Sequence, residues 1–495
     1  MAVVRLPHHS HRTAGAASRL DRHRPPRARA TKVCQRVSMT RTLDVDYLVV
    51  GAGAMGMGFA DALVDHSEAR VAIVDRRHGA GGHWLEDYPF VRLHQSSTFY
   101  GVASTVLGGH VQEQGPEAGL HVRASQPEIV DYYARAVERL RSTGRVEVLT
   151  GCDVVGRTVV SRISGKTWEV PASCRVVNAH YLAPSIPAES SAPFSVADDA
   201  RAVTVNDVVR LEEAPSQYVV VGSGKTATDA CVWLLGQGVD PDAICWVRPR
   251  DPWMLNRALI QPDPEIFLGV PATTFEEAAA SSSLDELFLR LEDAGVMLRI
   301  DPSVTPTMAK APTLGVWELE LLRSIENVVR HGHLRNVERG RLELEDGTTV
   351  RVADDAVVVH CAADGLKNPP LVSVWRPEEI TVQPVRAGFP CFSAAAIGYV
   401  EATRRDDAEK NRLCPPSRFG NSLQQWADMN VRGTRASMAL GAEPDIAAWS
   451  NTVAVNPARI PADHPRPAEL DRVRERLAAA TAPGLEALTR LMATG

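Results

Sequence analysis

A glycine-rich turn between two short apolar segments constrains the fold of this chain more than any other feature. Residues 46–50 form a compact apolar run, and the pattern Gly-x-Gly-x-x-Gly follows directly at 51–56. Phe59, Ala62 and Leu63 then recur at helical spacing. A strand, a tight turn and a helix in this order are typical of the first unit of a nucleotide-binding α/β domain.

Each glycine of this turn has its own task in such a unit. The first permits the tight turn, the second lets the backbone approach a diphosphate, and the third lets the helix pack on the strand. A second apolar run at 71–74 ends in an aspartate, whose carboxylate is placed to accept hydrogen bonds from a ribose. We therefore predict a first dinucleotide site formed by Gly51, Gly53, Ala54, Met55, Gly56, Asp75 and Arg76.

A second turn of the same type follows the apolar run at 217–221. It reads Gly-Ser-Gly-Lys-Thr-Ala at 222–227, and alanine is accepted at the third glycine position. An ATPase P-loop is excluded, because that motif needs a glycine where this chain has Val219.

The strand predicted at 244–247 ends in two arginines rather than in an acid. Guanidinium groups bind the 2′-phosphate of NADPH, which a carboxylate would repel. A solvated turn is the alternative for these two arginines. The predicted NADPH site consists of Gly222, Ser223, Gly224, Lys225, Thr226, Arg248 and Arg250.

The residues after the first turn resemble those of the two-dinucleotide-binding-domain flavoproteins, in particular the flavin-containing monooxygenase-like group. The sequence Gly-Gly-His-Trp at 81–84 and a Tyr-Pro…Arg stretch at 88–92 carry this resemblance. It implies an α/β fold of two Rossmann-like three-layer domains, with the NADPH domain inserted in the FAD domain. It also implies that FAD occupies the first site, bordered by Gly81, Gly82, Trp84, Arg92, His94 and Gln95. Core packing for Trp84 and a surface ion pair for Arg92 are the alternatives.

Composition, apolar periodicity and this resemblance together divide the chain into segments. We expect a disordered basic leader at 1–43, FAD-binding segments at 44–200 and 351–440, an NADPH-binding segment at 201–350 with a helical insertion at 262–330, and a C-terminal helical tail at 441–495. Apolar residues at i, i+3, i+4 and i+7 predict an amphipathic helix at 284–291, which fits either a small cap or a plain surface helix pair. Asp346-Gly347 marks a hairpin turn.

Charge is distributed unevenly along the chain. Residues 1–43 contain ten Lys and Arg and a single acid, Asp21, which leaves 44 basic and 59 acidic residues in the remainder. Because residues 44–495 are so acidic, we do not expect this part of the chain to bind nucleic acid. No apolar run is long enough to predict a membrane span. The basic leader fits an organelle targeting segment, but we favour a translation start at Met39.

The eight cysteines are dispersed, and the closest pair, Cys231 and Cys245, is 14 residues apart. No redox dithiol spacing and no zinc-ligand spacing occurs, so we expect no metal site. Dispersed cysteines in a long chain are typical of the reducing cytoplasm, which is the predicted location.

Two adjacent dinucleotide sites indicate hydride transfer from a nicotinamide to a flavin. The resemblance implies that reduced FAD then reacts with molecular oxygen. The leading hypothesis is an FAD-dependent, NADPH-consuming oxidoreductase that monooxygenates a small organic metabolite through a flavin C4a-(hydro)peroxide.

Two departures from the family pattern keep other functions open. The fingerprint Phe-x-Gly-x-x-x-His is absent between Pro187 and Gly222, which favours a flavin-dependent NADPH reductase or dehydrogenase without oxygen insertion. Ala179-His180-Tyr181 replaces a family Ala-Thr-Gly link, which is compatible with a non-catalytic redox sensor or scaffold. No residue is identified as a catalytic acid or base; the polar candidates are His94, Asn206 and Asn256.

Overall fold

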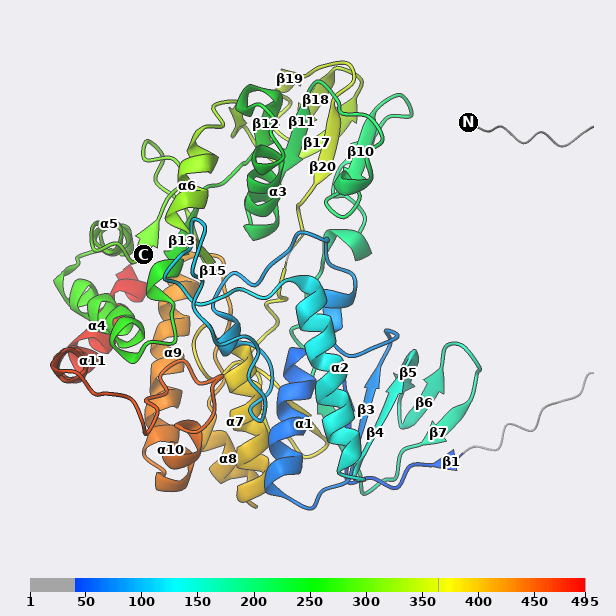
Figure 1. The fold of residues 1–495 in the computed structure, drawn as a ribbon, viewed down its shortest axis with the longest axis vertical. Coiled ribbons are helices and arrows are strands. Elements are labelled where there is room, and N and C mark those ends of the chain that lie inside the picture. Colours follow the sequence, from blue (N-terminus) through cyan, green and yellow to red (C-terminus); the bar gives the residue numbers. More distant parts are fainter. Residues whose placement is uncertain (1–40, 364, 495) are drawn as a thin grey trace, which may run out of the picture. The chain divides into compact units, whose positions relative to one another are not determined.

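The first parallel sheet forms around the strand that leads into the first glycine turn (Figure 1). The computed structural model describes residues 41–363 and 365–494. Five parallel strands lie side by side in the order β21 (Glu379–Thr381), β8 (Arg175–Asn178), β2 (Tyr47–Val50), β3 (Val71–Asp75) and β4 (Val146–Thr150). The two apolar runs predicted as strands around the turn are therefore adjacent and parallel, as an α/β sheet requires.

Small residues allow two helices beside this sheet to approach each other closely. Helices α1 (Ala54–His66) and α2 (Gln126–Ser142) contact the sheet, and α7 (Pro390–Thr403) packs along α1. A Cβ atom on Gly58 would lie 3.3 Å from the Cβ of Ala394, and one on Gly398 would lie 2.4 Å from the carbonyl oxygen of Phe59. The α1–α7 contact therefore depends on glycine at position 398.

A small mixed sheet is formed by chain segments before and between the strands of the first sheet, and its edge strand lies within the predicted leader. Its order is β1 (Arg41–Thr42), β7 (Thr167–Glu169), β6 (Thr158–Ser161) and β5 (Cys152–Val155), with β1 parallel to β7. Leu43 is 1% exposed. Arg41–Leu43 of the predicted leader are therefore part of the described fold, because Leu43 has apolar partners to pack against, and the rest of that leader lies outside the described residues.

The second parallel sheet surrounds the second glycine turn. Its order is β10 (Arg201–Thr204), β20 (Val357–His360), β11 (Tyr218–Val221), β12 (Ile244–Val247) and β16 (Val328–Val329), and α3 (Lys225–Gly236) follows β11. A four-stranded sheet belongs to the same half of the chain, in the order β19 (Thr349–Arg351), β18 (Arg341–Leu344), β17 (Leu334–Glu338) and β9 (Ser195–Val196). The antiparallel β18–β19 pair confirms the hairpin predicted at Asp346-Gly347. The predicted fold class, with two Rossmann-like parallel sheets, is confirmed.

Two predicted segment boundaries do not match the strand pairing. β20 lies between β10 and β11 in the second sheet, although residues 351–440 were assigned to the first domain. β9 pairs with β17, although residues up to 200 were assigned to the first domain. The physical reason is that a short apolar run such as 357–360 suits the centre of either parallel sheet, so its sequence does not specify which sheet it joins.

The segment predicted as a helical insertion contains helices and strands. The helices are α4 (Pro264–Ala280), α5 (Leu284–Asp293) and α6 (Val316–Arg323). Strands β14 (Met297–Leu298) and β15 (Met308–Leu314) flank β13 (Pro252–Asn256) in a three-stranded sheet, so the segment is not purely helical. The amphipathic helix predicted at 284–291 is α5, and the four apolar residues of the predicted i, i+3, i+4, i+7 pattern are buried.

The C-terminal part of the chain consists mainly of helices. They are α8 (Asp407–Leu413), α9 (Leu423–Gly441), α10 (Pro444–Ser450) and α11 (Ala468–Thr494), and α11 packs along α4. Gly484 sits in this contact, since a Cβ atom there would lie 2.2 Å from the Cβ of Phe275. Short 3-10 helices occupy Gly82–Leu85, Ser97–Phe99, Pro187–Glu189, Val208–Arg210, Pro241–Ala243 and Arg257–Leu259.

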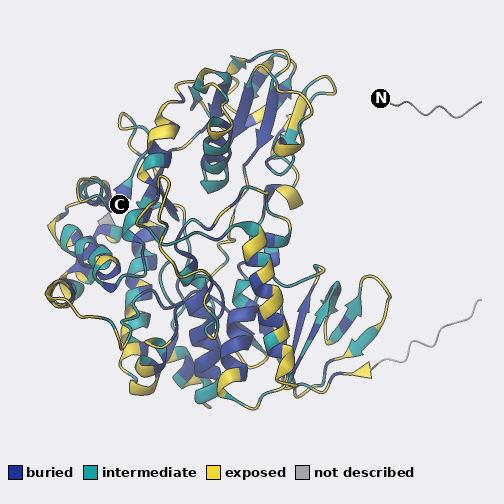
Figure 2. Cartoon of the chain, in the orientation of Figure 1, coloured by how far each residue is buried: buried dark blue, intermediate teal, exposed yellow. Residues whose placement is uncertain are grey.

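The core follows the two parallel sheets and the helices on them. In Figure 2, α1 is buried along most of its length, whereas α2 exposes one face. The described residues form one compact unit. Among the described helices, none is both long enough and apolar enough to cross a bilayer. The described residues also contain no group of His, Cys, Asp and Glu side chains arranged to hold a metal ion.

Candidate functional site

The first glycine turn has the geometry of an anion-binding corner. Gly51 adopts a φ of +110°, and its N–H donates to the Val74 carbonyl oxygen at 2.8 Å. A Cβ atom on Gly56 would lie only 1.8 Å from the carbonyl oxygen of Gly51, so no other residue fits there. Ala54 and Met55 form the first helical positions after this turn and are partly buried.

No side chain caps the N-terminus of α1. Its N-cap is Gly53, and its first turn contains no acidic residue. By contrast, Ser125 with Glu128 caps α2, and Ser422 with Gln425 caps α9. The first N–H groups of a helix carry partial positive charge and need an acceptor, so the α1 terminus is suited to an anion such as a diphosphate.

The carboxylate of Asp75 secures this corner to the end of β3. Asp75 is 7% exposed, and its two oxygens accept the N–H of Ala52 at 2.7 Å and the N–H of Arg77 at 2.8 Å. Each carboxylate oxygen has a second acceptor position, so a ribose hydroxyl can still be bound there. The neighbouring Arg76 forms an ion pair with Glu189 at 2.9 Å.

A pocket of about 430 Å³ opens beside Asp75 at the same edge of the first sheet. It extends from Arg76 after β3 to Thr150 at the end of β4, and the exposed Ile163 covers one side. An apolar wall together with arginine side chains can hold a planar aromatic base.

A second pair of glycines lies directly against the first corner. The N–H of Gly81 donates to the Ala52 carbonyl oxygen at 2.9 Å. Gly81 and Gly82 adopt φ values of +127° and +63°, and a Cβ atom on Gly82 would lie 3.0 Å from the Cα of Gly53. The 81–82 turn therefore forms one wall of the corner and requires glycine at both positions.

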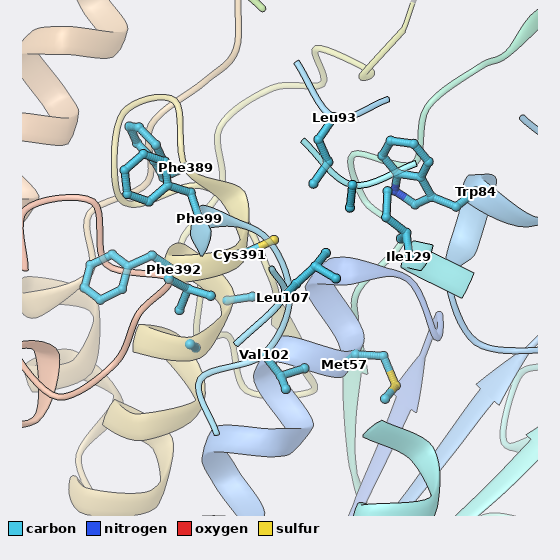
Figure 3. Packing of buried hydrophobic residues seen from close by; sticks show 14 of the residues in the cluster. Met57, Trp84, Leu93, Phe99, Val102, Leu107, Ile129, Phe389, Cys391 and Phe392 are labelled. Atoms are coloured by element: carbon cyan, nitrogen blue, oxygen red, sulfur yellow. The ribbon is translucent and has the colours of Figure 1, made fainter. Parts of the chain in front are cut away.

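The remaining predicted neighbours of the flavin have different environments. Trp84 is 6% exposed and belongs to the apolar core in Figure 3, where its Nε1 donates to Tyr100 Oη at 2.5 Å. Gln95 is buried. Arg92 is exposed and donates to the Arg123 carbonyl oxygen at 3.2 Å. The side chain of Trp84 is therefore a packed core group, and that of Arg92 lies at the surface.

The second glycine turn repeats the geometry of the first. Gly222 has a φ of +141°, and a Cβ atom there would lie 3.1 Å from the Cys361 carbonyl oxygen. A Cβ atom on Gly224 would meet nothing within 4 Å, so the backbone there is open to a ligand. Helix α3 starts after Gly224 without a side-chain cap and without an acid in its first turn. Ser223 and Thr226 flank this opening and are partly buried.

The two arginines after β12 have different environments. Arg248 is 1% exposed, its guanidinium lies 4.3 Å from the ring centre of Trp246, and its Nη2 pairs with Asp251 at 2.9 Å. Arg250 is exposed. The predicted pair of phosphate-binding arginines is corrected to one accessible group, because the Trp246 ring and Asp251 hold the Arg248 side chain in the interior.

Lys225 points into a buried group of charges and not freely into solvent. Its Nζ pairs with Asp229, one helical turn further along α3, and lies 3.6 Å from Glu318 Oε1. We call Glu117, Arg123, Lys225, Asp229, Arg257 and Glu318 the interdomain ion cluster; it contains three acids and three cations.

Both nucleotide-binding halves contribute to the interdomain ion cluster. Arg257 Nη2 binds Glu318 at 2.7 Å, and Arg257 also pairs with Glu117 from the other half. Burial alone would raise the pKa of Glu117 and of Glu318. The neighbouring cations reverse this effect and lower each pKa to about 2. Both carboxylates are therefore ionised at neutral pH.

Two further contacts join the halves beside this cluster. The Tyr88 hydroxyl donates to Asp229 at 2.8 Å, and the rings of Phe90 and Trp233 stack with their centres 4.8 Å apart. Both Tyr88 and Phe90 lie in the Tyr-Pro stretch after the first turn, whereas Asp229 and Trp233 lie on α3. The helix that starts at the second corner is thus held directly against the first half.

The three polar catalytic candidates have structural partners. Burial, together with Lys225 and Arg257, lowers the pKa of His94 to about 3, so its ring is neutral, and Nδ1 accepts the N–H of Thr313 at 3.3 Å. Asn206 donates to the Glu86 carbonyl oxygen at 2.8 Å. Asn256 caps the short helix at 257–259 through the N–H of Ala258 at 3.1 Å.

Sequence reasoning missed most of the interdomain ion cluster. Its one local signal is the i, i+4 spacing of Lys225 and Asp229 on a predicted helix, which favours an ion pair. Arg257 is 140 residues from Glu117, and no local pattern connects them.

Part of the chain matches a known family model. Residues 49–95, which include the first glycine turn and Asp75, match the model described as NAD(P)-binding Rossmann-like domain. Two solved structures are similar over most of the chain at low identity. Cyclohexanone monooxygenase from Rhodococcus sp. Phi1 bound to NADP+ has 14% identity and a TM-score of 0.45 over 90% of this chain and 98% of that chain. The OTEMO complex with FAD and NADP has 14% identity and a TM-score of 0.46 over 73% and 83%.

Two mycobacterial proteins are much more similar in sequence. They are Uncharacterized protein Rv2000 of Mycobacterium tuberculosis and Uncharacterized protein Mb2023 of Mycobacterium bovis. Each is 39% identical over 421 residues, which span 84% of this chain and 78% of the relative. At this identity and coverage, the chain belongs to the same family as these two mycobacterial proteins.

Proposed function

We propose that this protein is an FAD-dependent, NADPH-consuming oxidoreductase that inserts an oxygen atom into a small organic molecule. One observation carries the proposal: two glycine corners, each opening an uncapped helix N-terminus, belong to one unit and are joined through Tyr88 and Asp229. Two such corners within one unit are suited to two dinucleotides whose reactive rings must meet.

The first corner fits FAD. The N-terminus of α1 and the 81–82 turn would hold the diphosphate, and Asp75 would bind a ribose. The pocket beside Arg76 and Thr150 would receive the adenine. Bound there, FAD would accept hydride and activate oxygen, chemistry that amino-acid side chains do not supply.

The second corner fits NADPH. The N–H groups at the start of α3 and the open backbone at Gly224 would hold its diphosphate. Arg250, at the end of β12, is the accessible cation for the 2′-phosphate. The interdomain ion cluster would fix α3, and hence this corner, against the first half.

The chain's own residues would also exclude water beside the flavin. Phe99, Phe267 and Phe389 form a buried aromatic cluster with ring centres 5.3–5.8 Å apart. An apolar surrounding protects reactive oxygen chemistry from water.

The visible spectrum of purified protein tests the proposed cofactor. We expect a yellow protein from which acid releases a stoichiometric amount of FAD. Protein that is colourless, and stays so after incubation with FAD, would contradict the proposal.

A reductase or dehydrogenase that inserts no oxygen is the second candidate. The absence of the Phe-x-Gly-x-x-x-His fingerprint between Pro187 and Gly222 favours it. Turnover under oxygen-18 separates the two: label in an organic product supports oxygen insertion, and label found only in peroxide or water supports the reductase. The first proposal also includes a small-molecule substrate, molecular oxygen as co-substrate and a cytoplasmic location.

A further inference from the structure

The loop that joins β21 to α7 holds an arginine in a fixed position. The hydroxyl of Ser393 accepts the N–H groups of Val385 at 3.1 Å and of Arg386 at 3.0 Å. The next residue, Ala387, packs so closely on α9 that a Cβ atom on Gly433 would lie 2.5 Å from its nitrogen. The backbone at Arg386 is therefore anchored to two helices.

The guanidinium of Arg386 lacks a counter-charge. Its Nη1 donates to Ser437 Oγ at 2.5 Å, and its Nε is buried without an acceptor. No carboxylate in the described part of the chain forms an ion pair with it. Burial lowers the pKa of Arg386 to about 10, so the group still carries its charge at neutral pH.

The fully buried cations of the described chain are paired with acids. Arg257 binds Glu117 and Glu318, and Lys410 binds Glu401 at 2.6 Å. Arg248 also forms an ion pair, with its Nη2 2.9 Å from Asp251 Oδ1. Arg386 is only partly buried as a whole, but its Nε is buried without an acceptor, and such an unsatisfied donor is costly. The partner of Arg386 is therefore expected to come from outside the chain.

The segment that carries Arg386 also carries one member of the buried phenylalanine cluster. Arg386 follows the C-terminal end of β21, the edge of the first sheet at which parallel α/β folds bind ligands. Phe389, three residues on, packs against Phe99 at 5.3 Å and Phe267 at 5.4 Å between ring centres, and Figure 3 shows Phe389 beside Phe99. Arg386 itself is only partly buried, so a ligand can reach it.

We propose that Arg386 binds the carboxylate of the substrate, and that the substrates are apolar organic acids. A carboxylate can accept two parallel hydrogen bonds from a guanidinium, which would satisfy the Nε that has no acceptor in the chain. The apolar part of the acid would lie toward the phenylalanine cluster. This inference rests on the proposed function and specifies its substrate class.

Equilibrium binding to the FAD-loaded protein tests the inference. The ligands are phenylacetate and its neutral analogue phenylacetamide, followed by calorimetry and by the change in the flavin spectrum. We expect wild type to bind the acid about 10- to 100-fold more tightly than the amide, the range for a charged hydrogen bond. Arg386→Met should lose this preference and Arg386→Lys should keep part of it.

Two further measurements separate substrate binding from a structural role. Arg386→Met should retain FAD and should melt at or above the wild-type temperature, because it removes an uncompensated charge. Arg435→Met is the matched control, since Arg435 is exposed on the same helix as Ser437. It should leave the preference for the acid unchanged.

Several outcomes would overturn the inference. One is equal binding of acid and amide by wild type. Another is an Arg386→Met variant that loses FAD but keeps its preference for phenylacetate, which would make the arginine a cofactor ligand. A wild-type protein without flavin contradicts the proposed function instead, so the two failures are distinguishable.

Discussion

At the scale of single residues, the glycine corners are set by distances that only glycine can satisfy. Gly56 faces the carbonyl oxygen of Gly51, and Gly82 faces the backbone of Gly53. The first requirement lies within one turn, so the spacing of the glycines in the sequence was sufficient to predict each Gly-x-Gly corner.

Gly53→Glu should remove FAD. Its Cβ atom would lie 3.5 Å from the Cα of Gly82, and its carboxylate would occupy the anion position at the start of α1. The flavin content of purified protein is the measurement, with Gly236→Glu as control, because a side chain there meets nothing within 4 Å. Full flavin content in the Gly53→Glu variant would mean that FAD does not bind at this corner.

Arg250→Ala should weaken the binding of NADPH by about 1–3 kcal/mol, because it removes a charged hydrogen bond to the 2′-phosphate. The binding of NADH, which lacks this phosphate, should be unchanged. Titration of the oxidised protein with each nucleotide measures the difference. Arg248→Ala should instead lower the melting temperature, since Arg248 is buried and paired with Asp251. Equal losses for both nucleotides in Arg250→Ala would assign Arg250 another role.

The sequence could not distinguish these two arginines. Both follow the same strand, and the direction of each side chain depends on the Trp246 ring and on Asp251, that is, on packing around them. The sequence also could not predict that Arg386 has no acidic partner. Whether an acid lies near this arginine depends on which distant segments the fold brings together.

At the scale of elements, close packing between two helices can outweigh the helix propensity of a single residue in its effect on stability. Replacing a glycine by alanine inside a helix normally stabilises by up to about 1 kcal/mol. Gly398→Ala should destabilise by about 1–3 kcal/mol, because its Cβ atom would lie 2.4 Å from the carbonyl oxygen of Phe59 and push α7 away from α1.

Urea unfolding measures this effect, and Gly441→Ala at the end of α9 is the control, since nothing lies within 4 Å of its Cβ position. A stabilised Gly398→Ala variant would show that the two helices move apart at little cost.

The elements themselves were predictable where apolar periodicity was strong, as in α5, and less so where strands are short. Strand β14 has two residues, and β20 fits either sheet by its composition. Their positions follow from pairing with strands far along the chain, which no local window contains.

At the scale of the whole molecule, the interdomain ion cluster joins residues far apart in sequence, and it makes the protein sensitive to acid. Glu117 and Glu318 have pKa values of about 2, below the ordinary value of 4.5. Carboxyls with lowered pKa values stabilise the fold above pH 4.5, and this contribution is lost as the pH falls toward 2. A difference of this size corresponds to about 3 kcal/mol for each group.

The free energy of unfolding should therefore fall steeply below pH 4.5. Glu117→Gln should be less stable than wild type at neutral pH, because Arg123 and Arg257 lose a partner, and its stability should depend less on pH in the acid range. Urea unfolding at a series of pH values is the measurement. An unchanged slope in Glu117→Gln would show that other carboxyls govern acid unfolding.

The central claim is that two nucleotide corners in one unit bring a nicotinamide to a flavin. Its most direct test is the absorbance of the FAD-loaded protein after NADPH is added without oxygen. We predict complete bleaching of the flavin band, faster with NADPH than with NADH. An oxidised spectrum that persists while both nucleotides are bound would contradict the account.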